Sequence, residues 1–213
     1  MESNMQPENI EKAFFSDGYH IGMKAIEQEL SGIALHEGLR EMYSAIDDFI
    51  ESFVELAVQN KKSPECKKGC EWCCHQPVFA LDYELEYLNN FLNENFSEEE
   101  RKKISSRAEQ KMEKLKGLDK DALLNSKYPC PLLENGSCTA YEARPMACRI
   151  YLSYDVKTCL RFYNHPDDKK SYPALLEFSM RAGRMMNEGF KAALKTNGII
   201  AKEYRIEEKL HPI

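Results

Sequence analysis

The chain has 213 residues, of which 43% are hydrophobic and 30% charged, and its formal net charge is −6 at pH 7. This length and composition are typical of a globular protein with a sizeable core, and they exclude a fibrous or low-complexity chain. The negative charge argues against a broad surface for nucleic acid or anionic membranes.

The start of the chain lacks a signal pattern, and no stretch approaches the roughly 18–20 apolar residues that cross a bilayer. We therefore expect a cytoplasmic protein with neither a nucleic-acid nor a membrane partner. The sequence names no protein partner.

The first sixty residues predict two helices within 8–60. The second has the clearer apolar stripe, formed by Leu39, Met42, Tyr43, Ile46, Phe49, Ile50, Phe53, Val54 and Ala57. Ser31-Gly32 indicates a break between the two helices. Ser63-Pro64 ends the second, because proline disfavours helical geometry at the residue before it.

Helical patterns also fill 78–127, after a first cysteine-rich loop over 65–77. Their two apolar stripes are Leu81, Leu85, Leu88 and Leu92, then Ile104, Ala108, Met112 and Leu115. Ser97 and Glu100 form a capping box that starts the second helix. A short helix is expected over 119–126.

A second cysteine-rich loop covers 128–150, and Asn135-Gly136 within it predicts one short β-hairpin that brings Cys130 near Cys138. A last helix is expected within 171–197. The predicted class is mainly α: a helical bundle-like scaffold with two cysteine-rich loop segments that form a metal site. We expect a single domain over 1–213, with a metal-binding core at 63–160 between helices in 8–60 and 171–197.

All eight cysteines fall within 66–159: Cys66, Cys70, Cys73, Cys74, Cys130, Cys138, Cys148 and Cys159. In a reducing compartment, clustered thiols are more often ligands or redox groups than disulfides. Thiolates are soft ligands that suit zinc and iron–sulfur clusters. The helical insertion separates two ligand segments that a fold can bring together around one site.

Cys70-Glu71-Trp72-Cys73 is a C-x-x-C turn, and Gly69 before it gives the backbone freedom to bend. The adjacent pair Cys73-Cys74 is harder to explain with one ion, because neighbouring side chains diverge. One site or two, and a single ion or a cluster, stay open alternatives.

Four residues are predicted to surround the ligands. Arg144 and Arg149 flank Cys148, where cations offset the charge of about −2 of a zinc ion with four thiolates. Trp72 either shields the first cluster from water or is an ordinary core aromatic, and Tyr141 lies in the second loop. His75 and His165 are weaker candidates as ligands.

These residues resemble the CxxCxxCC cysteine-cluster family, also called YkgJ-like, a zinc- or iron-chelating domain. The match comprises Cys66-Lys-Lys-Gly-Cys70-Glu-Trp-Cys73-Cys74, Cys130-Pro131-Leu132, Gly136-Ser-Cys138, Tyr141, Arg144-Pro145 and Cys148-Arg149. The gap after Cys66 has three residues where the family name implies two, and Cys159 fits only as a further downstream cysteine. The resemblance implies metal binding.

The leading prediction is therefore a metal-binding protein that holds zinc, iron or an iron–sulfur cluster in a structural, carrier or accessory redox role. One alternative is a cluster-dependent enzyme, because flagellin lysine methylases look similar through a related cysteine cluster. The chain lacks a G-x-G-x-x-G loop, a P-loop and an HExxH motif, and no catalytic residue is assigned. Another alternative is a helical partner-binding scaffold with structural thiols.

Overall fold

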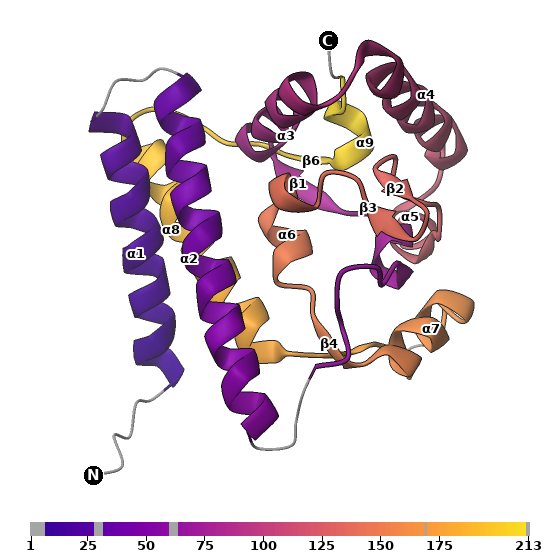
Figure 1. Cartoon of the computed structure of the whole chain (residues 1–213), viewed down its shortest axis with the longest axis horizontal. Helices are drawn as coiled ribbons and strands as arrows, with labels where there is room; N and C mark the ends of the chain where they lie inside the picture. Colours follow the sequence, from indigo (N-terminus) through magenta and orange to yellow (C-terminus); the bar gives the residue numbers. More distant parts are fainter. Residues whose placement is uncertain (1–6, 28–31, 60–63, 169, 212–213) are drawn as a thin grey trace. The chain divides into compact units, whose positions relative to one another are not determined.

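A computed structural model describes residues 7–27, 32–59, 64–168 and 170–211. The described chain is mainly α with a few short strands, which confirms the predicted class. It divides into two compact units, Met1–Lys62 with Leu176–Lys202 as unit 1, and Ser63–Leu175 with Glu203–Ile213 as unit 2 (Figure 1). The single domain over 1–213 stays a prediction. No helix in the described ranges is long and apolar enough to span a membrane.

Unit 1 contains α1 (Pro7–Glu27), α2 (Gly32–Gln59) and α8 (Glu177–Thr196), each of which packs against the other two. The two helices predicted within 8–60 are confirmed, whereas Ser31 and Ser63, at the predicted breaks, lie outside the described residues. The last helix begins later than the predicted range 171–197. Pro173 disfavours helical geometry at the residue before it, and the two residues that follow it form a strand instead.

The closest approach inside unit 1 is between α1 and α8, at Gly18 and Gly189. A Cβ atom on Gly18 would lie 1.9 Å from the carbonyl oxygen of Met186, and one on Gly189 would lie 2.0 Å from that of Phe15. The two backbones therefore touch with no side chain between them. An apolar-stripe analysis does not reveal such a contact, because glycine contributes nothing to the stripe.

Replacing Gly18 by Ala is expected to lower the free energy of unfolding by about 1–3 kcal/mol, the usual cost of forcing extra atoms into a packed interface. Alanine is the better helix former, so the loss would arise from the crossing and not from helix propensity. Urea unfolding would measure it, with Asp17→Ala on the exposed side of α1 as the control. A Gly18→Ala protein as stable as the control would contradict the close approach.

Unit 2 holds both cysteine-rich segments. Its elements are η1 (Trp72–His75), β1 (Phe79–Leu81), α3 (Asp82–Asn95), α4 (Glu98–Leu115), α5 (Lys120–Asn125), β2 (Leu133–Glu134), β3 (Ser137–Cys138), η2 (Tyr141–Ala143), α6 (Met146–Arg149), β4 (Ser153–Asp155), α7 (Val156–Asn164), β5 (Ala174–Leu175), β6 (Glu203–Arg205) and α9 (Ile206–Lys209). The strands form three separate antiparallel pairs: β1 with β6, β2 with β3, and β4 with β5.

Local sequence signals explain several of these boundaries. The Ser97 N–H donates to Glu100 Oε2 over 2.8 Å while Ser97 Oγ accepts from the Glu100 N–H, so the predicted capping box starts α4. The predicted hairpin is also present. Asn135 and Gly136 form its turn with φ angles of 50° and 75°, the left-handed region that this turn type requires.

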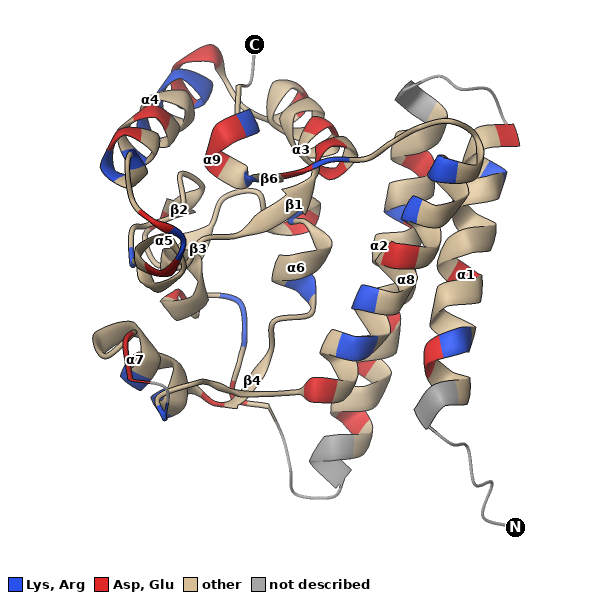
Figure 2. Cartoon of the chain, turned by 180° about the vertical axis from the view of Figure 1, so that it is seen from behind, with Lys and Arg blue, Asp and Glu red and all other residues tan. Residues whose placement is uncertain are grey.

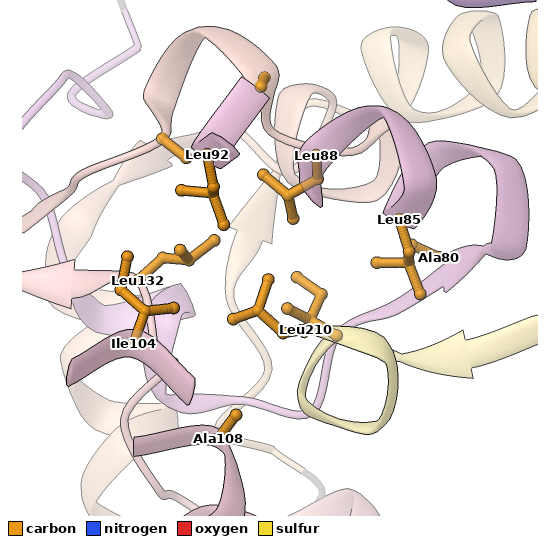
Figure 3. Packing of buried hydrophobic residues seen from close by; sticks show 11 residues of the cluster. Ala80, Leu85, Leu88, Leu92, Ile104, Ala108, Leu132 and Leu210 are labelled. Atoms are coloured by element: carbon orange, nitrogen blue, oxygen red, sulfur yellow. The ribbon is translucent and has the colours of Figure 1, made fainter. Parts of the chain in front are cut away.

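The core of unit 2 gathers residues from α3, α4, the hairpin region and the C-terminal segment (Figure 3). It contains Ala80, Leu85, Leu88, Leu92, Ile104, Ala108, Leu132, Ala140, Ala143, Ile206 and Leu210. The segment 203–210 reaches this core because β6 pairs with β1, with Ala80 opposite Tyr204. This segment thus belongs to the cysteine-bearing unit, although it follows α8 in the chain.

Glu84 fixes the start of two helices at this core. Its side chain is buried, with Oε2 accepting the Leu81 N–H over 3.0 Å and Oε1 accepting the Met146 N–H over 2.8 Å. The carboxylate therefore accepts hydrogen bonds from two buried N–H groups that have no intrahelical partner, at the N-termini of α3 and α6. Because Cys148 lies on α6, this contact helps to position one of the predicted ligands.

Charged residues of both signs share the surface of unit 2, most clearly along α4 (Figure 2). Lys102 pairs with Glu98 and Lys103 with Glu99, each one helical turn apart. In unit 1, Arg181 on α8 pairs with Glu11 on α1. Basic residues late in the chain are thus at least partly balanced by neighbouring acids.

Candidate metal centre

All eight cysteines lie in unit 2 as free thiols, with Cys159 buried and the others partly buried. Within 7–27, 32–59, 64–168 and 170–211, no three His, Cys, Asp or Glu side chains form a closed arrangement that would hold a metal ion as they stand. The thiols nevertheless fall into neighbouring sets. To bind a metal ion, the sulfur atoms of one set would have to move closer together.

The core thiol group consists of Cys74, Cys130, Cys138 and Cys148. Its members come from η1, the loop before β2, the strand β3 and the short helix α6. The Cys130 N–H donates to the Cys74 carbonyl over 2.7 Å, which ties the two cysteine-rich segments together. Cys130, Cys138 and Cys148 also pack against the apolar core of the unit.

Burial is the largest cause of a raised pKa for three of these thiols. It raises the pKa of Cys130 to about 12 and that of Cys138 to about 11, and it raises the pKa of Cys148 well above the ordinary value. The neighbouring thiols of Cys130, Cys138 and Cys74 raise the pKa of Cys148 further. For Cys74, a hydrogen bond with the Cys73 thiol is the largest cause of a raised pKa.

Several groups act in the opposite direction and favour the thiolate form. Lys111 lowers the pKa of Cys130, and so does a hydrogen bond at its sulfur from the backbone of Leu132. At Cys138, a backbone hydrogen bond from Ala140 is the largest such effect, followed by Arg144 and Lys68. Backbone N–H groups and cations directed at sulfur stabilise its anion, so the surroundings are suited to thiolate ligands.

The α7 thiol group consists of Cys66, Cys70 and Cys159. The Cys66 N–H donates to the Ser153 carbonyl over 3.0 Å, which fixes Cys66 beside β4. Burial raises the pKa of Cys66, and the thiols of Cys70 and Cys159 raise it further. Burial also raises the pKa of Cys159, whereas the hydroxyls of Ser153 and Thr158 lower it. These contacts place Cys66, Cys70 and Cys159 near one another.

A family model described as "CxxCxxCC: Putative zinc- or iron-chelating domain" matches residues 65–173, slightly more than half of the chain. The chain belongs to the CxxCxxCC family. The matched range contains all eight cysteines and lies entirely within unit 2. Searches of curated proteins and of solved structures gave no significant match.

Membership of the CxxCxxCC family supports a metal-binding role, with zinc or iron as the metal. The donor set agrees with this chemistry. Cysteine sulfur is the ligand that structural zinc and iron–sulfur centres use most, and four thiolates complete a tetrahedral site. The core thiol group supplies four such donors, and backbone hydrogen bonds at Cys130 and Cys138 lower the pKa of these thiols against the larger, opposite effect of burial. The residues therefore fit the metals that the family description names.

The residues that were predicted to surround the ligands differ in what they contact. Arg144 stacks on the Tyr141 ring at 3.7 Å and lowers the pKa of Cys138 and Cys148, so both residues lie at the core thiol group. Arg149 is buried with its guanidinium donating to the carbonyls of Arg144 and Glu142, where it braces the backbone around α6.

The aromatic residues of the first cysteine-rich loop, 65–77, contact α7. Trp72 lies 5.3 Å and His75 lies 5.0 Å from the Tyr163 ring, measured between ring centroids. The His75 Nδ1 atom lies 3.1 Å from the Glu71 carbonyl oxygen. His165 is exposed at the end of α7. Trp72 is therefore a partly buried residue of η1 that contacts Tyr163 on α7.

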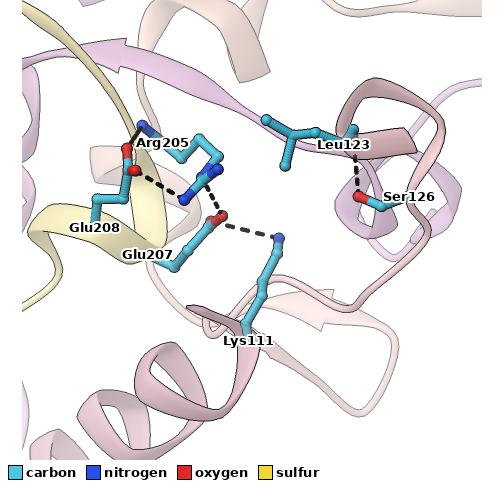
Figure 4. Close-up of polar contacts among 6 residues, drawn as sticks. All are labelled: Lys111, Leu123, Ser126, Arg205, Glu207 and Glu208. Atoms are coloured by element: carbon cyan, nitrogen blue, oxygen red, sulfur yellow. Dashed lines mark hydrogen bonds and ion pairs between the residues drawn. The ribbon is translucent and has the colours of Figure 1, made fainter. Parts of the chain in front are cut away.

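The sequence analysis missed Lys111, a buried cation next to the core thiol group. Its ammonium is 3.5 Å from the Glu207 carboxylate, and Glu207 Oε1 is 3.1 Å from Arg205 Nε (Figure 4). Lys111 also lowers the pKa of Cys74 and Cys130. A signal was present in the sequence. Lys111 lies seven residues after Ile104, on the buried stripe of α4, whereas the predicted stripe residue Met112 is only partly buried.

Proposed function

We propose that this CxxCxxCC protein holds one zinc or iron ion in a tetrathiolate centre formed by the core thiol group, and that the ion has a structural role. The observation that supports the proposal is that Cys130, Cys138 and Cys148 pack against one apolar core, while the Cys130 N–H donates to the Cys74 carbonyl. An ion shared by these elements would join the two cysteine-rich segments. Its binding energy would contribute to the folding of both.

Charge balance supports a thiolate centre at this position. Four thiolates around a divalent ion leave a net charge of about −2, which is costly away from water unless cations lie close by. Lys111, Arg144 and Lys68 each lower the pKa of at least one of these thiols. The Lys68 ammonium also lies 5.3 Å from the centroid of the Tyr141 ring. Arg144 stacks on the same ring.

Anaerobic purification followed by metal analysis and an absorption spectrum tests the proposal. The wild-type protein is expected to retain zinc or iron through a wash with a competing chelator, and Cys148→Ser is expected to lose the ion of this centre. Met146→Leu, a volume-conserving change on the same short helix, is the matched control and should retain it.

Equal metal retention in Cys148→Ser and Met146→Leu would contradict the assignment of Cys148 as a ligand. A brown protein that contains iron and sulfide would identify an iron–sulfur cluster as the occupant in place of a single ion. A colourless protein with stoichiometric zinc would exclude such a cluster. The cytoplasmic location stays a prediction.

Without metal, the stability of the protein is expected to fall as the pH rises above about 9. The pKa of Cys130 is about 12 in the folded protein against an ordinary value of 9.0, so between these values the unfolded chain loses the proton first. Deprotonation therefore favours unfolding, and the contribution is fully present only below pH 9. Urea midpoints of the metal-free protein between pH 8 and 11 would measure this fall.

Cys130→Ser is the variant that isolates this effect, because serine does not titrate in the same range. Its midpoint should fall less steeply with pH than that of the wild type. Cys138, whose pKa is raised to about 11, would account for part of the remaining slope. Parallel pH profiles for the two proteins would rule out the contribution of Cys130.

A further inference from the structure

We propose that Cys66 and Cys70 form a redox-sensitive dithiol, which a small disulfide of the glutathione class converts reversibly into a disulfide bond. The pair lies outside the core thiol group that is proposed to hold the metal, so the inference goes beyond the proposed function and does not depend on it. The family description concerns metal chelation and assigns no redox role to these cysteines.

The first support is that the two thiols already contact each other. The thiols of Cys66 and Cys70 form a hydrogen bond. The Cys70 N–H also donates to the Lys67 carbonyl over 3.0 Å, which closes a turn, and Gly69 within this turn has a φ angle of 96°. A disulfide forms only where the chain returns on itself and the two side chains point toward each other. The turn provides this arrangement before any bond forms.

The second support is that the backbone is held on both sides of the turn. The Cys66 N–H donates to the Ser153 carbonyl over 3.0 Å, which ties that end of the turn to β4. At the other end, the Cys74 N–H donates to the Glu71 carbonyl over 2.9 Å, directly after Cys70. Two thiols that are held next to each other have a high effective concentration, so the bond between them is favoured over a lasting mixed disulfide.

The third support is that a small oxidant can reach the pair. Cys66 and Cys70 are only partly buried, and the three residues between them are exposed. Cys159, the remaining member of the α7 thiol group, is buried. Access therefore distinguishes the pair from the third thiol beside it.

The other hydrogen-bonded pair of thiols, Cys73 and Cys74, is less suited to the same reaction. An unstrained disulfide joins residues whose Cα atoms are about 4.4 Å or more apart, whereas neighbours across a trans peptide bond are about 3.8 Å apart. A bond between adjacent cysteines would therefore distort the backbone. Cys66 and Cys70 are four residues apart and avoid this strain.

The reaction consists of two thiol–disulfide exchanges. The Cys70 sulfur attacks one sulfur of oxidised glutathione, the bond between the two glutathione sulfurs breaks, and the departing glutathione takes the proton. The Cys66 sulfur then attacks Cys70 Sγ and releases the second glutathione, which takes the second proton. Two protein thiols are oxidised while one oxidised glutathione is reduced to two thiols. Burial raises the pKa of Cys66, so the first attack is assigned to Cys70.

Thiol counting and peptide mapping of the full chain, reconstituted with zinc, test the proposal. After incubation with oxidised glutathione, the protein is expected to lose two of its eight thiols and to retain its zinc. Trypsin followed by chymotrypsin places Cys66 on peptide 63–67 and Cys70 on peptide 69–72, so the disulfide would appear as a linked pair of these peptides. Dithiothreitol should restore all eight thiols.

Three variants separate the roles of the thiols. Cys66→Ser lacks the thiol that completes the reaction, so its Cys70 is expected to stop at the mixed disulfide with glutathione. Cys70→Ser should not react at this site. Cys159→Ser is the matched control and should form the same disulfide as the wild type. The linked peptides are detected in the wild type, so the test stands even where a variant does not fold.

A disulfide from Cys66 or Cys70 to Cys159, or oxidation confined to Cys73 and Cys74, would overturn the assignment. Eight thiols retained in a glutathione buffer that oxidises dithiothreitol would overturn it as well. Release of zinc as the bond forms would place the pair within the metal centre and contradict its independence. A protein that forms the disulfide but binds no zinc would overturn the proposed function and leave the redox-sensitive pair standing.

Discussion

Removal of the metal is expected to loosen residues 64–77 and 128–160 while α1, α2 and α8 largely keep their protection from hydrogen exchange. Both loosened segments consist mostly of turns, short strands and single helical turns, so few regular hydrogen bonds hold them. Structural zinc contributes on the order of 10–16 kcal/mol of apparent binding energy in small zinc-binding peptides. Loss of the metal should therefore lower the protection from hydrogen exchange first in the segments that supply the ligands.

Hydrogen–deuterium exchange with and without chelator measures this effect, peptide by peptide. Peptides from α3 and α4 provide an internal comparison, because these helices belong to the same unit but contain no cysteine. Cys148→Ser without chelator should reproduce the loosening around the core thiol group. Equal protection of 64–77 and 128–160 in the presence and absence of chelator would rule out a structural role for the metal.

Replacing Glu207 by Gln is expected to lower the free energy of unfolding by about 3–5 kcal/mol, the usual cost of removing one partner from a buried ion pair. Glu207 is fully buried and Lys111 is only 5% exposed, so water cannot replace the lost carboxylate charge. The neighbouring variant Glu208→Gln is a matched control. Its side chain is 36% exposed, and a pair at such a position contributes about 0–1 kcal/mol.

Urea unfolding of the metal-loaded protein would compare the two variants. The double variant Lys111→Met with Glu207→Leu should recover much of the loss, because a well-packed apolar pair can replace a buried ion pair. The same double variant should bind metal less tightly, since it removes the cation beside Cys74 and Cys130. Equal stability losses in Glu207→Gln and Glu208→Gln would contradict the buried pair.

The helices were largely predictable because their signals are local. The stripe from Leu39 to Ile46 is buried in unit 1, Ser97 and Glu100 form the expected cap, and Asn135-Gly136 forms the expected turn. Each of these features depends on residues within a few positions of one another. Helical periodicity and turn chemistry are therefore sufficient to find them.

The strand pairs were not predictable, because each strand has two or three residues and its partner is often far away in the sequence. The pairing of β1 with β6 joins Leu81 to Glu203, and no short-range pattern indicates such a contact. The burial of Lys111 beside Glu207 is a similar case, since each charge is stable in the interior only because the other is present.

The eight candidate ligands could be found from the sequence, because cysteine clustering is itself a strong chemical signal. Their grouping could not. It depends on which segment each turn places next to the core or next to α7, as the contacts of Cys130 with Cys74 and of Cys66 with Ser153 show. The adjacent cysteines Cys73 and Cys74 were expected to diverge, whereas the structure has a hydrogen bond between the two thiols.

The interruption of unit 2 by α8 has a consequence for how the protein is made. The ribosome synthesises both cysteine-rich segments, and then all of α8, before it reaches Ile206 and Leu210. Until those residues emerge, the nascent chain carries a full set of thiols with part of their apolar support missing. We therefore expect metal loading into the proposed centre to follow translation of this segment, with thiols that are open to oxidation in the interval.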